Sequence, residues 1–242
     1  MNAFRVVAVE LRRATDTRAP RWAIGVSVAV GLVVTCTQPG GPPTTFVEFM
    51  SVATIALPVL VGLLAVMAFT ADWATRAALI TFTLSPRRGP VLAARYAAVL
   101  IITVSLVVVL HLLGAVLYLA LRPEAAGTIA SVAVVGQLGS MTGLAVAATL
   151  TSIAVAGLVL RTSVALLVVV LGPFALTVGF GFLPTLADWL GPYSFASWLA
   201  EPTIDLWSPD RVGVGPAATS FCLWTALPCV LGWIRQLRAE PR

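Results

Sequence analysis

Six long apolar segments with almost no charge constrain the fold of this chain more than any other feature. A helix needs about 20 mostly apolar residues to cross the hydrocarbon layer of a membrane. Only 10% of the 242 residues are charged, whereas soluble domains carry about 25%. The sequence therefore predicts an all-α membrane protein with six transmembrane helices in one domain, residues 1–242. The six segments are residues 22–37, 46–69, 91–121, 128–160, 163–183 and 215–234.

The arginines predict how these helices are oriented. All fifteen basic residues are Arg. If both termini are cytoplasmic, thirteen arginines lie on the cytoplasmic side, and only Arg122 and Arg211 lie outside. An excess of positive charge in cytoplasmic loops is the usual sign of orientation. We therefore predict a multi-pass protein of the cell membrane with both termini in the cytoplasm.

The absence of lysine excludes one class of site. A Walker A loop uses a lysine to reach the phosphates of a nucleotide, and this sequence contains no lysine. We expect the chain to bind no cofactor of its own, so any nucleotide-driven work depends on another polypeptide.

Two segments outside the apolar runs are predicted to lie at membrane surfaces. Residues 1–21 alternate apolar residues with arginines, which is typical of an interfacial amphipathic helix; a frayed basic tail is the alternative. Residues 184–210 combine four prolines with aromatic side chains, which favours short helices in the outer interface. A plain loop with interfacial anchors is the alternative for this outer re-entrant region.

Residues 70–95 form a polar, arginine-bearing interruption between two apolar runs. Within it, residues 72–84 predict an amphipathic helix, because four apolar residues share one face at the spacing i, i+4, i+7 and i+11. Those four are Trp73, Ala77, Ile80 and Leu84. Pro86 ends the helix, since a proline disfavours helix in the preceding residue. Two uses fit the pattern equally well, a helix on the membrane surface or a docking surface for a partner protein.

Helix breakers inside the apolar runs mark places where helices can bend. Pro58 lies in the second run, and Gly172 and Pro173 lie together in the fifth. A proline inside a helix frees a backbone carbonyl and kinks the helix, so we predict hinges at these residues. The GxxxG pattern from Gly139 to Gly143 permits close helix approach, although such pairs are common by chance in Gly-rich spans.

Few side chains in the six runs have the chemistry for transport or catalysis. His111 is the one ionisable side chain at depth, whereas ion-coupled transporters usually need buried carboxylates, Lys or Arg. A lone His offers no convergent metal ligands and is more often a packing residue. We expect no catalytic residue and no metal site. Gln137, Ser140, Thr142 and Thr177 line a polar path or form interhelical hydrogen bonds, and the second role is favoured.

The segment 70–95 resembles the membrane-spanning permease subunit of type-2 ABC exporters. In that family an acidic and aromatic pair follows the second span, then come a coupling helix, a Pro-Arg-Arg-like stop and a basic residue opening the third span. The matching residues here are Asp72-Trp73, residues 74–84, Ser85-Pro86-Arg87-Arg88 and Arg95. The chain departs from the family in having Asp for the usual Glu, Arg for the usual Lys, and no following Gly-Thr pair. The family also has an interfacial N-terminal helix and re-entrant helices before the last span.

The resemblance implies a dimer of permease subunits, identical or different, with two separate ABC ATPase subunits that hold ATP and Mg²⁺. The ATPase would contact the coupling helix of residues 72–84, and Pro58 and Gly172-Pro173 would bend. Membrane lipid is a further partner and nucleic acid is not. The cargo is expected to be amphiphilic, drug-like or lipid-like, because the spans lack buried charge. The docking residues implied are Asp72, Trp73, Arg76, Leu79, Phe82, Arg87 and Arg88.

Two other classes of function stay open. One is an ATP-independent membrane interaction protein, such as an immunity factor that occupies a partner. The other is an intramembrane enzyme, in which Ser140 and His111 would have to pair. An ATPase reading frame beside this gene would favour the exporter over the first of these.

Overall fold

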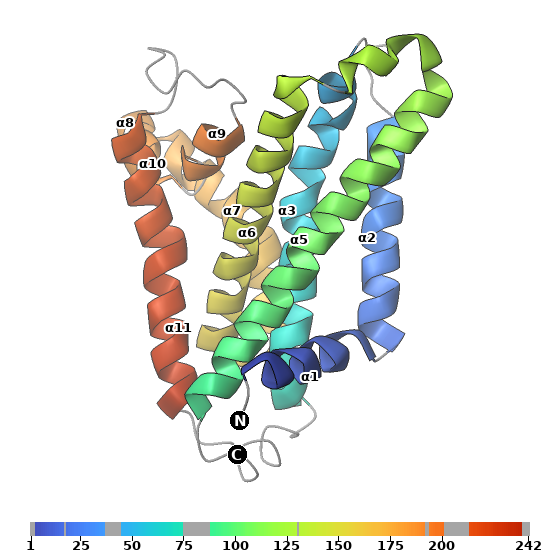
Figure 1. The fold of residues 1–242 in the computed structure, drawn as a ribbon. Coiled ribbons are helices and arrows are strands. Elements are labelled where there is room, and N and C mark those ends of the chain that lie inside the picture. The colour runs from blue at the N-terminus through green and yellow to red at the C-terminus, as the bar shows by residue number, and fades with distance from the viewer. Residues whose placement is uncertain are drawn as a thin grey trace.

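The computed structural model describes residues 3–16, 18–36, 45–74, 88–129, 131–191, 194–200 and 213–238. All regular structure in these residues is helical, which confirms the predicted class (Figure 1). The elements are α1 (Ala3–Asp16), α2 (Arg18–Cys36), α3 (Phe46–Ala74), α5 (Arg88–Leu121), the 3-10 turn η1 (Pro123–Thr128), α6 (Val132–Val159), α7 (Thr162–Gly181), α8 (Pro184–Leu190), α9 (Ser194–Ala200), α10 (Val214–Phe221), the π-helical turn η2 (Cys222–Ala226) and α11 (Leu227–Arg238).

Four helices in the described residues are long and apolar enough to cross a membrane, which indicates a multi-pass membrane protein. They are Gly89–Leu121, Ala133–Val159, Thr162–Phe180 and Val214–Arg238, and they match the last four predicted spans. Helices α2 and α3 occupy the first two predicted spans, and their crossing of the membrane stays a prediction. Helix α5 has 34 residues, roughly 50 Å at 1.5 Å per residue, so it exceeds the hydrocarbon layer of about 30 Å.

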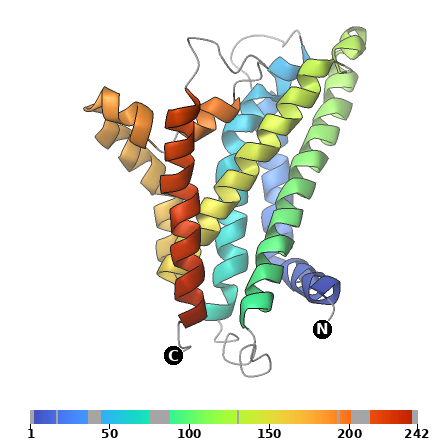
Figure 2. The same ribbon diagram turned by 60° about the vertical axis from the view of Figure 1, so that its left-hand side comes forward.

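Helix α6 lies at the centre of the bundle. It packs most extensively against α3, and it also contacts α5, α7, α9 and α11. Helix α1 lies across one end of the bundle, and α11 ends there too (Figure 1). The short helices α8 and α9 lie at the opposite end (Figures 1 and 2). We call the end that holds α1 the base of the bundle.

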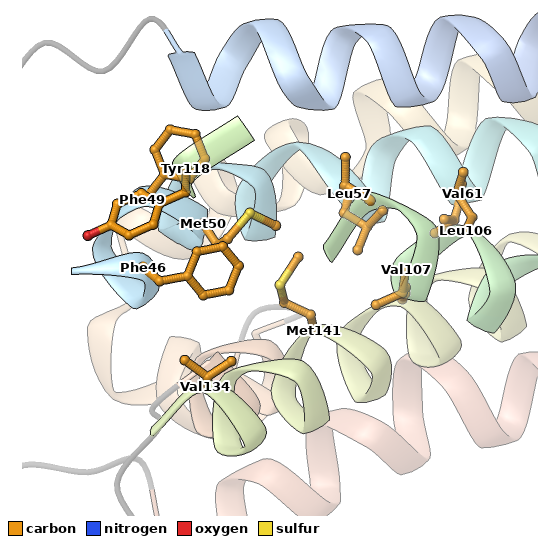
Figure 3. Packing of buried hydrophobic residues seen from close by; sticks show 12 residues of the cluster. Phe46, Phe49, Met50, Leu57, Val61, Leu106, Val107, Tyr118, Val134 and Met141 are labelled. Atoms are coloured by element: carbon orange, nitrogen blue, oxygen red, sulfur yellow. The ribbon is translucent and has the colours of Figure 1, made fainter. Parts of the chain in front are cut away.

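Close packing holds α3, α5 and α6 together. In lipid, helices associate through van der Waals packing rather than by leaving water. Near the end opposite the base, Met50 of α3 and Met141 of α6 extend into the space between these helices (Figure 3). Gly114 of α5 permits this approach, because a Cβ atom there would overlap the Met50 sulfur. A second buried cluster nearer the base contains Val66, Phe69 and further residues of α5, α6 and α7.

Hydrogen bonds attach the upper half of the last span to the short helix α8. Side chains of α10 and η2 donate to three carbonyls at the end of α8: Thr219 to Trp189 at 2.9 Å, Ser220 to Gly191 at 2.8 Å, and Trp224 to Leu190 at 2.7 Å. The last carbonyls of a helix have no partner within it, so these side chains satisfy groups that α8 itself leaves unpaired. The predicted short helices before the last span are thus present as α8 and α9, whereas residues 201–210 lie outside the described residues.

The turn between α6 and α7 contains a strained residue. Leu160 has a φ of 57° and ends α6 in the left-handed conformation, and its N–H donates to the carbonyl of Ala156. Side chains with a Cβ atom pay about 1–2 kcal/mol there, and glycine does not. We expect Leu160→Gly to stabilise the protein by about 1 kcal/mol, measured as a higher thermal unfolding midpoint in detergent.

Leu158→Gly is the matched control for that substitution. Leu158 lies two residues earlier, inside the last regular turn of α6, where glycine costs about 1 kcal/mol relative to good helix formers. The two variants should therefore shift the midpoint in opposite directions. A decrease in both would show that the αL conformation at Leu160 costs nothing.

Candidate functional site

A buried ion pair joins the N-terminal helix to the rest of the bundle. Nε of Arg95 on α5 donates a hydrogen bond to Oε2 of Glu10 on α1 over 3.2 Å. Glu10 is 7% exposed and Arg95 is 5% exposed. Separating a buried pair is costly, because each charge would be left without its partner in surroundings of low dielectric constant. The pair therefore fixes α1 against the first turns of α5.

Three aromatic rings extend this pair across the base of the bundle. The guanidinium of Arg95 lies 5.8 Å from the centre of the Phe69 ring on α3. Phe69 meets Tyr96 edge-on with centroids 4.9 Å apart, and Tyr96 meets Trp233 of α11 at 5.5 Å. Such cation–π and edge-to-face contacts contribute about 0.5–1.5 kcal/mol each. We call Glu10, Phe69, Arg95, Tyr96 and Trp233 the base cluster; it links α1, α3, α5 and α11.

Helical periodicity explains why Glu10 turns inward. Val7, Leu11 and Ala14 follow the spacing i, i+4, i+7 and form the apolar side of α1. Glu10 lies three residues after Val7, on the same side. A carboxylate buried on an apolar side needs a cation as partner, and Arg95 provides it.

Most of the predicted docking residues lie outside the part of the chain that the structure describes. These are Arg76, Leu79, Phe82 and Arg87. The predicted helix of residues 72–84 was expected to begin at Asp72, but α3 continues unbroken through Ala74. Asp72 and Trp73 therefore extend α3 by its last turn, because neither Gly nor Pro follows Phe69 before that point. Arg88 is the first residue of α5.

The base cluster lies close to both places where the chain leaves the described structure for residues 75–87. Along α3, Phe69 precedes the last residue, Ala74, by little more than one turn; along α5, Arg95 follows the first residue, Arg88, by about two turns. The one carboxylate of the cluster, Glu10, is held by Arg95. What it provides is a single point at which the two flanks of this segment contact α1 and α11.

The predicted hinge residues lie within continuous helices. Pro58 is inside α3 and Pro173 is inside α7. A Cβ atom at Gly172 would meet only Val168, at 3.8 Å, so this part of α7 is loosely surrounded. Bending at these residues stays a prediction.

The predicted polar residues of the spans mostly bond within or between helices. Gln137 donates to the carbonyl of Val47 on α3 at 2.7 Å, which confirms the favoured interhelical role for this residue. Ser140 donates to Gly136 of its own helix. His111 is buried edge-on against Phe46 at 5.1 Å, and neither of its ring nitrogens has a hydrogen-bond partner within the described residues. The described residues bring no three His, Cys, Asp or Glu side chains together as a metal site.

Sequence reasoning missed Glu10 as a site residue. The sequence nevertheless contains a signal, because Glu10 is the only acidic residue among the first fifteen. It also falls on the apolar side of an amphipathic helix, where an unpaired carboxylate would be costly. Its partner could not be chosen from fifteen arginines without the tertiary structure.

Comparisons with known proteins assign no family or function to the chain, because no family model, no curated protein and no solved structure matches it.

Proposed function

We propose that this chain is the membrane-spanning permease subunit of an ATP-driven ABC exporter, worked by separate ATPase subunits. The observation that supports this most directly is the base cluster. It ties a transverse N-terminal helix to α3, α5 and α11, next to the segment whose sequence resembles a coupling helix. A force applied by an ATPase to residues 75–87 would reach these four helices at once.

The proposal includes six membrane crossings with both termini in the cytoplasm. Helices α2 and α3 supply the two crossings beyond the four long apolar helices. The base of the bundle is then cytoplasmic, which agrees with its arginines. Helices α8 and α9 lie on the outer side, where they form the re-entrant region.

A second permease subunit is proposed to pack against α7. Four apolar side chains on one face of this helix are more than half exposed, at the spacing i, i+4, i+7 and i+11. They are Leu167, Leu171, Phe174 and Val178. The bending point proposed at Gly172-Pro173 lies within this stretch, so a change at the dimer interface and a bend of α7 would be coupled.

The proposed cargo is amphiphilic, drug-like or lipid-like. The described parts of the long helices bury no carboxylate, and their buried Arg95 is paired with Glu10 of α1. An ion or a strongly polar cargo would need charged partners at depth. ATPase stimulation in a reconstituted complex by a panel of amphiphiles tests this, and stimulation by hydrophilic sugars alone would contradict it.

Co-purification with an ATPase tests the docking surface. We expect the tagged wild-type chain to retain a co-expressed partner ABC ATPase, and the double variant Leu79→Asp, Phe82→Asp to lose most of it. The physical reason is that apolar anchors in the centre of an interface contribute about 2 kcal/mol or more each, so two buried aspartates should weaken binding at least 100-fold. The measurement is ATPase recovered per permease after detergent extraction.

The matched control changes the same residue types at the other end of the bundle. Phe182 and Leu183 lie between α7 and α8 and are 80% and 53% exposed, so Phe182→Asp, Leu183→Asp should retain the ATPase. Equal retention by the wild type and the Leu79, Phe82 variant would refute the docking surface. Cargo movement by the purified chain without any ATPase would instead favour the alternative, an ATP-independent membrane interaction or immunity protein.

A further inference from the structure

Three side chains able to bind a soft metal ion come together between α3, α5 and α6, and each helix contributes one. Met50 of α3 and Met141 of α6 are fully buried and extend toward each other (Figure 3). On α5, Gly114 lies against the Met50 sulfur. His111 precedes Gly114 by three residues, so both lie on the same side of α5. The His111 ring also lies 5.1 Å from that of Phe46, one turn before Met50.

The register of the helices places His111 level with Met141. Helices α5 and α6 run in opposite directions (Figure 1), and the hydroxyl groups of Thr103 and Thr149 share a hydrogen bond of 2.9 Å between them. His111 lies eight residues after Thr103, and Met141 lies eight residues before Thr149. Eight residues correspond to about 12 Å of rise in either helix. The two side chains therefore leave their helices at the same depth.

Two buried polar side chains at this level have atoms whose hydrogen bonds are not made. His111 is 7% exposed, and both of its ring nitrogens lack a partner among the described residues. Gln137 is 6% exposed and lies one turn before Met141 on the same side of α6. Its Nε2 donates to the carbonyl of Val47, whereas its Oε1 has no partner in the described helices. An imidazole in such surroundings is costly unless something binds it.

We propose that Met50, His111 and Met141 bind one Cu(I) ion between α3, α5 and α6. Thioether sulfurs select soft ions such as Cu(I), and imidazole also binds copper. Methionine has three rotatable bonds, so both sulfurs can turn toward an ion held by the imidazole. All three ligands are neutral, so Cu(I) adds one positive charge to the interior, whereas Zn²⁺ would add two.

Gln137 completes this arrangement. A histidine that binds a metal ion usually donates its other ring N–H to an oxygen, and Oε1 of Gln137 is such an acceptor. His111 thus has convergent ligands, contrary to expectation, because thioethers from two other helices join it. The inference does not depend on the permease function.

Anaerobic titration of the full chain in detergent with Cu(I), against a coloured Cu(I) chelator, tests the site. The three cysteines are replaced by alanine throughout, because thiolates also bind Cu(I). We expect one ion per chain. Met141→Leu and His111→Leu should each weaken binding by at least about 100-fold, since loss of a mere hydrogen-bond partner of a ligand already costs about 10–100-fold. The matched control is Met67→Leu, about 25 Å from Met50 along α3, which should leave the affinity unchanged.

X-ray absorption by Cu(I) bound to the cysteine-free parent keeps the inference testable if a ligand variant fails to fold. Both sulfur and nitrogen neighbours should surround the ion. Met141→Leu is itself a mild change, because leucine and methionine have similar volumes. Equal affinities in Met141→Leu and Met67→Leu, a spectrum without sulfur neighbours, or no binding by the folded parent would each overturn the proposed site.

Discussion

Glu10→Leu should lower the stability of the protein by about 3 kcal/mol, the usual cost of removing one partner from a buried ion pair. Arg95 would keep its charge in a site where it is 5% exposed, without the carboxylate that compensates it. For a chain of this size the loss corresponds to roughly 6–12 °C in Tm. Thermal unfolding in detergent measures it, and faster amide hydrogen exchange in α1 would show that this helix has separated from α5.

Two further variants separate the ion pair from general damage to α1. Glu10→Leu combined with Arg95→Leu should recover most of the lost stability, because replacing both charges of a buried pair by apolar groups is often close to neutral. Arg13→Gln should cost less than about 1 kcal/mol, since Arg13 is 36% exposed and lies 3.9 Å from the same carboxylate. If the double variant is no more stable than Glu10→Leu alone, the base cluster does not depend on this pair.

Gly232→Leu should separate α11 from α6 and cost about 3 kcal/mol, the upper part of the range for overpacking. A Cβ atom at Gly232 would lie 2.9 Å from the backbone oxygen of Ala154 and 3.4 Å from its Cα. Backbone atoms of a central helix cannot turn aside as a side-chain end can, so the two helices would have to move apart. Gln236, which is buried against Gly157 one turn further on, would be displaced from this contact as well.

Gly139→Leu is the matched control, because no atom lies within 4 Å of a Cβ at that position. It should change the unfolding midpoint by less than the equivalent of about 0.5 kcal/mol. Similar losses in both variants would mean that leucine is harmful at any glycine of these helices. An unchanged midpoint for Gly232→Leu would mean that α6 and α11 do not approach as closely as the structure indicates.

The pattern of apolar runs and breakers was sufficient to predict the helices. Each predicted run contains a helix, since a chain in lipid has to satisfy its backbone hydrogen bonds internally. The errors are at the ends, where local signals are weakest. Helix α2 begins at Arg18 rather than at Trp22, and α3 continues to Ala74.

Contacts between helices could not be predicted in the same way, as the glycines illustrate. The GxxxG pattern pointed to Gly139 and Gly143, but Gly139 faces open space and Gly143 contacts Leu199 of α9. The close approach of α6 and α11 involves Gly157 and Gly232, which are far apart in the sequence and form no motif. A single sequence shows which residues are small, whereas the helix that lies opposite each of them depends on how the whole bundle packs. For the same reason, the sequence alone could not show which arginine pairs with Glu10.

The last span changes its hydrogen-bond pattern at η2, where Pro228 follows shortly after and has no N–H to donate. Above this turn, α10 is bonded to the end of α8, and below it Arg235 and Cys229 donate to carbonyls of α6. Bends concentrate at such π turns. A tilt of α8 would thus move α10 with it, while α11 stays packed against α6. The two halves of this helix would then move independently.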